Sequence, residues 1–229
     1  MKLKTMLFKM ESDQLIKEDS AKLRGFFANK FNNYLLLHNH LGKDKFLYQY
    51  PRIQYKTINQ VKVILGLAEG VNVLQDICNK YDQIVLNEHT YKIFSKEIIL
   101  KEEDFGIAPD ENIKYEFLSP WFALNEENYQ RYKNYNYSER ADQLKSILIR
   151  NIMAMAKTFQ YFVDSKIIIN TNLKETSIKF KGEDVIGFFG TFQVNFYLPD
   201  YIGLGKSVSR GFGTIKKINN QEKNKAKST

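Results

Sequence analysis

The sequence predicts an α+β fold made of two tandem ferredoxin-like (RRM-like) domains, the second less regular than the first. In the first hundred residues, hydrophobic periodicity indicates the order strand, helix, strand, strand, helix, strand, which is the split βαβ pattern. The second half starts again with an extended segment and one long helix, but no second helix is evident. We therefore expect domains at residues 1–101 and 113–218, joined by an acidic linker that contains Gly106 and Pro109.

The first two elements carry clear signals. Polar and apolar residues alternate over residues 2–10, which predicts a half-buried strand. Asp19 or Ser20 then caps a helix that has an apolar side and a basic edge and ends near residues 38–40, His-Asn-His. The apolar side comprises Leu23, Phe26, Phe27, Phe31, Tyr34 and Leu35, and the basic edge comprises Lys22, Arg24 and Lys30.

Further strands and a short helix complete the first half. The extended segment after the first helix contains Pro51, which indicates an edge strand or a bulge, and the apolar run at 62–67 predicts a buried strand. A short helix opens at Gly70, and residues 83–86 and 90–100 form a hairpin. Alternation over residues 46–56 places four side chains on one face: Phe46, Tyr48, Tyr50 and Arg52.

The second half is predicted to hold one long helix and several strands. Residues 114–124 are extended on both sides of Pro120, and the longest helix starts at Ser138 or Asp142 and ends near Val163. Its apolar residues recur at helical spacing and belong to the core: Leu144, Ile147, Leu148, Ile152, Met155, Phe159 and Phe162. Strands follow at 166–170, 177–180 and 185–196, and a glycine-rich turn leads to a last strand at 212–218.

Composition favours a polyanionic partner. The formal net charge is +8 and the pI is about 9.3, so cations concentrate nucleic acid or acidic lipid near the surface. Basic residues with abundant aromatic rings suit single-stranded nucleic acid, although most rings fill the core. Cys78 is the only cysteine, which excludes an intramolecular disulfide and a thiolate metal cluster. No stretch is long enough to span a membrane, so we expect a cytoplasmic protein with a basic tail at 219–229.

The most distinctive stretch is residues 201–218, where four of the twelve glycines fall within eleven residues. Glycine lets the backbone approach a ligand closely, and neighbouring cations hold phosphates, so the stretch predicts a phosphate cradle. A nucleotide P-loop is disfavoured because Asp200 stands where its first glycine belongs, and the dinucleotide fingerprint fails at Val208. The alternative is a glycine-rich turn before the last strand. The cradle residues are Gly203, Gly205, Lys206, Ser207, Arg210, Gly211 and Gly213.

The same stretch partly matches the RNA-binding signature K/R-G-F/Y-G/A-F-V-x-F/Y. Two of its aromatic positions are occupied by Thr214 and Lys217. The positions that agree are Arg210, Gly211, Phe212, Gly213 and Ile215. The partial match favours RNA over DNA as the polyanion.

Two of the three histidines, His38 and His40, fall within three residues. Cleavage of RNA through its own 2′-hydroxyl needs a base, an acid and a cation, and two imidazoles and Lys30 supply these groups. Residues i and i+2 share a face only in extended chain, so joint action requires a non-helical segment after Leu37. The alternatives are ordinary surface or core histidines and a zinc pair, which needs further ligands; we predict no metal and no cofactor.

On its two halves, on the loop at 203–213 and on the histidine segment after the first helix, the chain resembles a known family. That family comprises the metal-independent endoribonucleases that process CRISPR precursor transcripts, in the repeat-associated RNA-binding superfamily. The resemblance implies catalysis by His38 and His40, with Lys30 on the first helix and Tyr48 beyond it. It also implies that the glycine-rich loop faces the RNA.

The implied reaction is one cut per repeat in precursor CRISPR RNA, by 2′-hydroxyl attack, leaving a cyclic 2′,3′-phosphate and a 5′-hydroxyl. Tyr50 and Arg52 are candidates for contact with RNA bases or backbone. The competing hypothesis is a non-catalytic RNA-binding subunit of a CRISPR effector complex, which would have no need of a histidine pair. Besides repeat RNA, the partner hypotheses are effector-complex subunits and a second copy of the chain.

Overall fold

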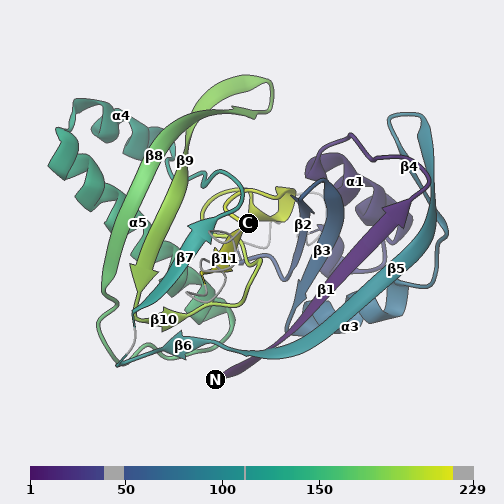
Figure 1. The fold of residues 1–229 in the computed structure, drawn as a ribbon, viewed down its shortest axis with the longest axis horizontal. Helices are drawn as coiled ribbons and strands as arrows, with labels where there is room; N and C mark the ends of the chain where they lie inside the picture. The colour runs from purple at the N-terminus through teal and green to yellow at the C-terminus, as the bar shows by residue number, and fades with distance from the viewer. Residues whose placement is uncertain (39–48, 111, 219–229) are drawn as a thin grey trace, which may run out of the picture.

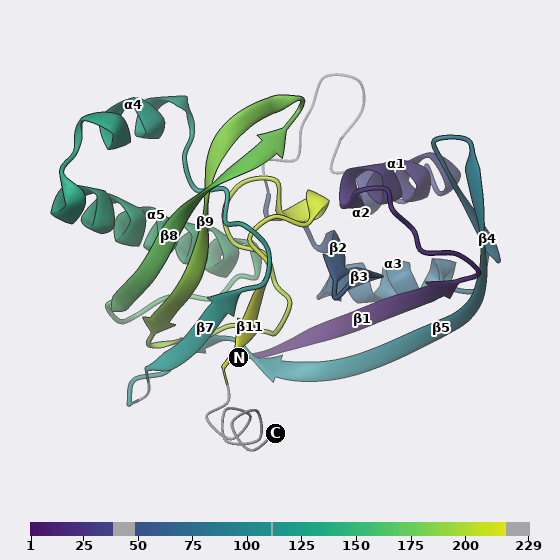
Figure 2. The same cartoon turned by 45° about the horizontal axis from the view of Figure 1, so that its top comes forward.

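The structure is a computed structural model that describes residues 1–38, 49–110 and 112–218. Two antiparallel sheets stand side by side, and the segment that joins the last strands of the chain runs between them (Figure 1). Turning the molecule shows α1 and α3 over the N-terminal sheet and α5 behind the C-terminal one (Figure 2). None of the helices in these ranges has the length and apolar character needed to cross a bilayer.

The N-terminal sheet has the strand order β2-β3-β1-β5-β4, with every neighbouring pair antiparallel. The predicted ferredoxin-like order of strands and helices is therefore confirmed, with β4 added at the hairpin end. The strands are β1 (Lys2–Ser12), β2 (Ile53–Ile58), β3 (Val61–Leu67), β4 (Gln83–Leu86) and β5 (His89–Asp104). The helices are α1 (Ser20–Lys30), α2 (Leu35–His38) and α3 (Glu69–Ile77).

The first predicted helix is in fact two. Asp19 caps α1, as its side chain accepts a hydrogen bond from the Lys22 N–H at 2.9 Å. The helix ends because Phe31 leaves the helical region, with φ −120° and ψ 53°, and a turn separates it from α2. The prediction for the next strand was also too long: β2 begins at Ile53, so Tyr50 and Arg52 precede it.

The C-terminal sheet has the order β11-β7-β9-β8. Counted along the chain, these are the fourth, first, third and second ferredoxin strands, which is the ferredoxin-like order. Residues 198–214 take the place of the second helix, and this half is therefore less regular. The strands are β6 (Gly106–Ile107), β7 (Ile113–Phe117), β8 (Ile169–Phe180), β9 (Glu183–Val194), β10 (Phe196–Tyr197) and β11 (Ile215–Lys217). The helices are α4 (Glu126–Asn134), α5 (Tyr137–Thr158) and the short 3₁₀ helix η1 (Val208–Arg210).

Four predictions in this half were wrong in detail. The acidic linker is partly strand, because β5 runs into it as far as Asp104 and β6 pairs with β10. The helix α4 was not predicted, since Tyr132 is its only buried residue. A capping box between Asn136 and Glu139 starts α5, which ends at Thr158, before Val163. The strand β8 is continuous where two short strands were expected, and its hairpin with β9 is paired throughout.

The described residues form two hydrophobic clusters, one of which joins the two halves. The N-terminal sheet is apolar on both faces: Met6, Phe8 and Ile64 lie under the helices, while Leu7 and Leu65 belong to the cluster that fills the C-terminal half. The largest side chains of that shared cluster are fully buried: Trp121, Tyr115, Phe105, Phe188, Phe192 and Phe196. The sheet edge at β2 therefore lies between the two halves, where the glycine-rich loop meets it.

Candidate nucleic-acid interface

The glycine-rich loop (residues 203–213) begins in the C-terminal half and reaches across to the N-terminal half. There η1 lies against α1 and β2 (Figure 1). A Cβ on Gly211 would lie 3.0 Å from Ser20 Oγ and 3.2 Å from the Tyr55 carbonyl oxygen, and its φ is +93°. Only glycine permits this approach, so Gly211 is the point where the loop closes onto the other half.

Two buried polar side chains of β2 hold the loop at its ends. Gln54 accepts a hydrogen bond from the Gly203 N–H at 3.0 Å, and Gln54 also donates to the Tyr50 hydroxyl at 2.8 Å. That hydroxyl in turn donates to the Gly203 carbonyl. At the other end, Lys56 Nζ donates to Thr214 Oγ1 at 3.1 Å. Because both ends are tied to one strand, the loop has a defined position.

The other glycines of the loop pack against the protein itself. A Cβ on Gly213 would lie 1.9 Å from the Leu204 carbonyl oxygen, and one on Gly205 would lie 2.6 Å from Trp121 Nε1. A Cβ on Gly203 would lie 2.6 Å from the Cβ of Val208. Internal packing thus accounts for these glycines, as the turn alternative predicts.

Several backbone N–H groups of the loop nonetheless remain available. Those of Lys206 and Gly213 donate to the carbonyls of Phe122 and Pro120, at 2.8 Å each. In the ranges that the structure covers, no acceptor is found for the N–H groups of Gly205, Ser207, Val208 and Ser209. Free N–H groups between two cations retain the character of an anion cradle.

Two arginines, from α1 and η1, lie near each other beside the C-terminal end of α2. Arg24 of α1 donates from Nη2 to the carbonyl of His38 at 2.8 Å. Burial and, second, the positive charge of Arg210 lower the pKa of the Arg24 guanidinium. Neither arginine forms an ion pair with a carboxylate of the described residues, so the cluster has positive charge that a phosphate would neutralise.

Of the predicted catalytic residues, His38 lies at this cluster. It is the last residue of α2, its ring is half-buried, and its Nε2 has no hydrogen-bond partner within the described ranges. His40 and Tyr48 lie outside the described residues. The backbone carbonyl of His38 and the η1 segment that carries Arg210 are far apart in the sequence, and both lie beside α1, which carries Arg24.

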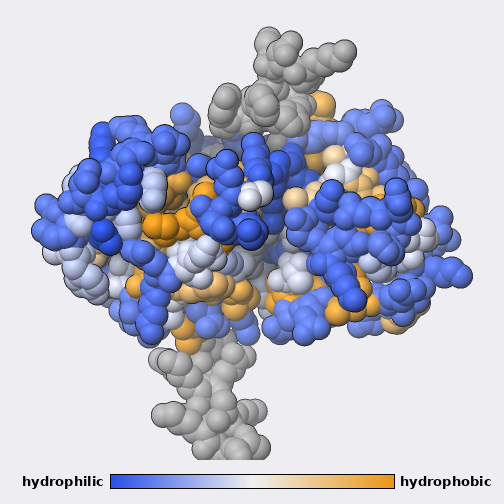
Figure 3. Space-filling model, turned by 90° about the horizontal axis from the view of Figure 1, so that it is seen from above, coloured by the Kyte–Doolittle hydropathy of each residue, from blue (hydrophilic) through white to orange (hydrophobic). Residues whose placement is uncertain are grey.

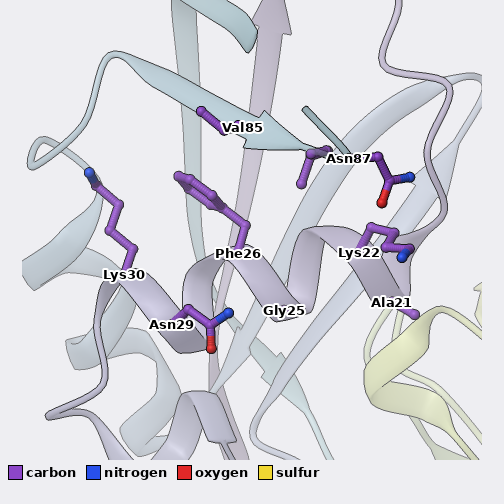
Figure 4. Close-up of a pocket in the computed structure, with 9 residues that line it drawn as sticks. Ala21, Lys22, Gly25, Phe26, Asn29, Lys30, Val85 and Asn87 are labelled. Atoms are coloured by element: carbon purple, nitrogen blue, oxygen red, sulfur yellow. The ribbon is translucent and has the colours of Figure 1, made fainter. Parts of the chain in front are cut away.

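Lys30 lies on another side of α1. It lines a cavity of about 520 Å³ between the helix and the end of β4, together with Phe26, Asn29 and Asn87 (Figure 4). Its ammonium group lies 5.9 Å from the centroid of the Phe26 ring. At about 100° per residue, positions 24 and 30 point roughly 120° apart around the helix, so Lys30 does not join the arginine cluster.

Tyr50 and Arg52 are engaged inside the protein. Burial raises the pKa of the Tyr50 hydroxyl well above its usual range, and its ring packs edge-on against Phe159 with centroids 5.9 Å apart. Arg52 Nε lies 3.0 Å from a carboxylate oxygen of Glu69, and its Nη2 donates to the Thr158 carbonyl at 3.4 Å. Both residues therefore connect elements of the fold.

Lys206 and Arg210 flank an aromatic cluster of Phe122, Phe180 and Phe212. The Lys206 ammonium lies 4.6 Å from the Phe122 ring centroid, and the Arg210 guanidinium lies 5.9 Å from that of Phe180. The three rings contact one another, with centroids 4.9 to 6.2 Å apart. Figure 3 shows hydrophobic surface within the hydrophilic face of the C-terminal half. Rings beside cations are the arrangement on which nucleobases stack.

Sequence reasoning missed three residues around the glycine-rich loop. Arg24 is one of several cations on the basic edge of α1, and nothing in its spacing distinguishes it. Lys56 is fully buried, and burial lowers its pKa to about 7. Tyr55 is buried under α1 with a hydroxyl that lacks a partner among the described residues. Nothing in the sequence distinguished Lys56, because its strand also contains the polar residues Gln54 and Thr57.

Two family models match the chain: the Cas6b N-terminal domain over residues 1–104 and the Cas6b C-terminal domain over residues 107–218. An uncharacterized protein of Methanocaldococcus jannaschii is 38% identical over 137 residues, which make up 59% of this chain and 92% of that protein. A crystal structure of a CRISPR-associated protein Cas6 has a TM-score of 0.56 at 12% identity, covers 95% of this chain and 99% of its own, and shows the same fold.

Two solved structures are much closer to this chain. A crystal structure of Cas6b matches with a TM-score of 0.88 and 36% identity, and a structure of the CRISPR RNA processing endoribonuclease Cas6b matches with 0.78 and 35%. Each comparison covers 95% of this chain and 100% of the other. With both halves matched by the family models and the fold shared throughout, the chain belongs to the Cas6b family.

Proposed function

We propose that this protein is an endoribonuclease that cuts precursor CRISPR RNA within its repeats without a metal ion. The observation that carries the proposal is the meeting of His38, Arg24 and Arg210 at the junction of the two halves. The likeness to a Cas6b structure described as a CRISPR RNA processing endoribonuclease supports the substrate class.

In the proposed reaction, the RNA's own 2′-oxygen attacks the adjacent phosphorus and the bond from phosphorus to the 5′-oxygen breaks. The 2′-hydroxyl gives its proton to a base, and an acid protonates the leaving 5′-oxygen. We assign these roles to His38 and His40. The products are a cyclic 2′,3′-phosphate and a 5′-hydroxyl, and no bond to the protein forms.

Charge builds on the nonbridging oxygens of the phosphate during this step. Arg24 and Arg210 would bind those oxygens, because two guanidiniums without a carboxylate partner among the described residues already lie near each other there. This replaces Lys30, which points to another side of α1, as the residue that supplies the cation. We propose Lys30 and Tyr48 as supporting residues. Lys30 would act from the cavity that it lines.

The glycine-rich loop would hold the RNA beside the cut. Its N–H groups at Ser207 and Ser209, for which the described residues offer no acceptor, and its flanking cations Lys206 and Arg210 suit phosphates. Gly203, Gly205, Gly211 and Gly213 take part through the loop conformation that they permit. Tyr50 and Arg52 act in the same indirect way, through the position of β2 and the loop.

The test is incubation with the host's own repeat RNA in excess EDTA, followed by identification of the product ends. Cleavage should continue and leave the two ends named above. A single deoxynucleotide at the cut should stop it, because the attacking oxygen is then missing. An absolute requirement for a divalent metal ion overturns the mechanism. Binding without cleavage favours the non-catalytic subunit of an effector complex.

A further inference from the structure

The outer edge of β5 is unpaired over most of its length within the part of the chain that the structure describes. Its hairpin partner β4 pairs only with residues 89–92, whereas its pairing with β1 is regular from Lys96 to Asp104. Figure 2 shows no described strand along the outer side of this part of β5, whereas α3 lies against one face of the sheet. Within the described residues, 96–104 thus offer an unpaired backbone edge to a further strand.

The register shows which backbone groups face that edge. The Phe105 N–H donates to the Met1 carbonyl at 2.9 Å, which continues the register of β1 and β5. The backbone N–H and C=O groups of the odd-numbered residues of β5 therefore point towards β1. The Ala68 N–H donates to the Lys4 carbonyl, so the backbone groups of the even-numbered residues of β1 point towards β3. This agrees with the odd-numbered residues of β1 pairing with β5. The N–H and C=O groups of Lys96, Ile98, Leu100 and Glu102 therefore point outward.

Apolar side chains accompany these groups. Ile98 is 42% exposed and Leu100 is 51% exposed. Both lie on the helix-covered face, since their register partners Phe8 and Met6 belong to the cluster beneath α1 and α3. Leu100 also borders a shallow hollow beside α3. A strand added here would bury both side chains as well as pair the backbone.

We propose that this edge pairs in antiparallel fashion with the same edge of a second copy of the chain, about a two-fold axis at Ile99. In that register Ile98 of one copy faces Leu100 of the other, and Glu97 faces Lys101. An axis at Leu100 would oppose Glu97 with Glu103 and Ile98 with a carboxylate, and an axis at Lys101 would oppose two lysines. The charge pattern therefore favours pairing with a second copy in the Ile99 register over these two registers.

The intramolecular contacts are compatible with this pairing. Lys9 Nζ lies 2.8 Å from Glu97 Oε2, so the carboxylate would sit between Lys9 and Lys101 of the second copy. Lys96 donates to the carbonyls of Cys78 and Tyr81 and stays on its own subunit. The inference does not depend on the proposed reaction, because it uses only the edge of the N-terminal sheet.

Cysteine cross-linking of the full chain tests the register. In the proposed pairing, the two copies of residue 99 form a non-hydrogen-bonded pair with Cα atoms about 4.5 Å apart, which a disulfide can bridge. Ile99→Cys should give a covalent dimer under mild oxidation. The native Cys78 is buried and should give none.

Glu97→Cys and Lys101→Cys are the matched controls on the same face of β5. Each should stay monomeric alone, since its own copies would be about 13 Å apart along the strand, but a mixture of the two should link. Melting curves establish that each variant is folded. Dimers from Lys101→Cys alone overturn the register. Wild-type protein that sediments as a monomer at every concentration, with no link from Ile99→Cys, overturns the interface.

Discussion

The two halves of the molecule share one strand order but differ at one connection. Along the chain, the third and fourth ferredoxin strands of the N-terminal half are joined by α3 and a hairpin strand. In the C-terminal half they are joined by an irregular segment that contains the glycine-rich loop. A helix in that place covers its own sheet. The loop instead reaches the neighbouring half and carries Arg210 to Arg24.

The difference indicates how two halves with the same strand order can form one candidate site between them. The N-terminal half contributes His38 and Arg24 from its first two helices, and the C-terminal half contributes the cation and N–H groups of the loop. We therefore expect loss of the His38 imidazole to alter the chemical step alone, and changes at Arg210 of the loop to alter RNA binding as well. The following variants test that division, from the largest effect to the smallest.

His38→Ala should lower the cleavage rate by roughly 10²–10⁴-fold with little change in RNA affinity, because it removes one acid or base and leaves the phosphate-binding cations in place. Single-turnover cleavage and equilibrium binding measure the two quantities. His89→Ala is the control, as that imidazole is exposed and lies 3.6 Å from Glu18. A wild-type rate for His38→Ala would remove this residue from the reaction.

Gly213→Ala should destabilise the fold by more than about 3 kcal/mol, since its φ is +63° and a Cβ would overlap the Leu204 carbonyl. Gly25→Ala is the same chemical change in α1, where a Cβ meets nothing within 4 Å, and it should stabilise by about 0.5–1 kcal/mol. Urea denaturation compares them. Equal effects of the two changes would mean that the loop glycines are not held by internal packing.

Lys56→Met should stabilise the protein at pH 7 by about 1–4 kcal/mol. Burial lowers the pKa of Lys56 to about 7 from its usual 10.5. Between those values the unfolded chain keeps a proton that the folded chain has released, so this lysine makes stability rise with pH. The advantage of Lys56→Met should therefore shrink as the pH increases from about 7 to about 10. A constant difference between the two proteins would contradict the lowered pKa.

Arg210→Ala should weaken binding of single-stranded repeat RNA and reduce the log–log salt slope by about 0.7 for each phosphate that the side chain neutralises. Lys2→Ala serves as the control, because that lysine pairs with Asp104 at 2.9 Å on an exposed edge. Affinity at several salt concentrations distinguishes the two. An unaltered slope for Arg210→Ala would show that it holds no phosphate and would leave the loop a purely structural connection.

Much of the fold could be predicted because its signals are local. Alternation defines β1, and the apolar run defines β3. The break after Lys30 could not be seen, since aromatic residues continue at helical spacing through Tyr34. Nor could α4 be seen, because a helix with one buried residue has no apolar stripe. The middle of β8 reads as polar because the hairpin arm is largely exposed on both faces.

The site depended on contacts between distant parts of the chain. The glycine-rich stretch marked Arg210, and the histidine pair marked His38, but no spacing rule could show that both approach Arg24. Tyr50 was placed on a strand face by alternation, whereas it lies before β2 and bonds to Gly203. Local pattern cannot predict such partners, because they are set by how the two sheets pack.

The apolar outer face of the N-terminal sheet has a consequence for synthesis on the ribosome. Leu3, Leu7, Val63 and Leu65 belong to the cluster that the C-terminal half completes. When the first hundred residues have emerged, this face is still exposed to water, and the nascent chain is most prone to aggregate during that interval. Completion of the second half ends the interval and assembles the proposed RNA site in one step.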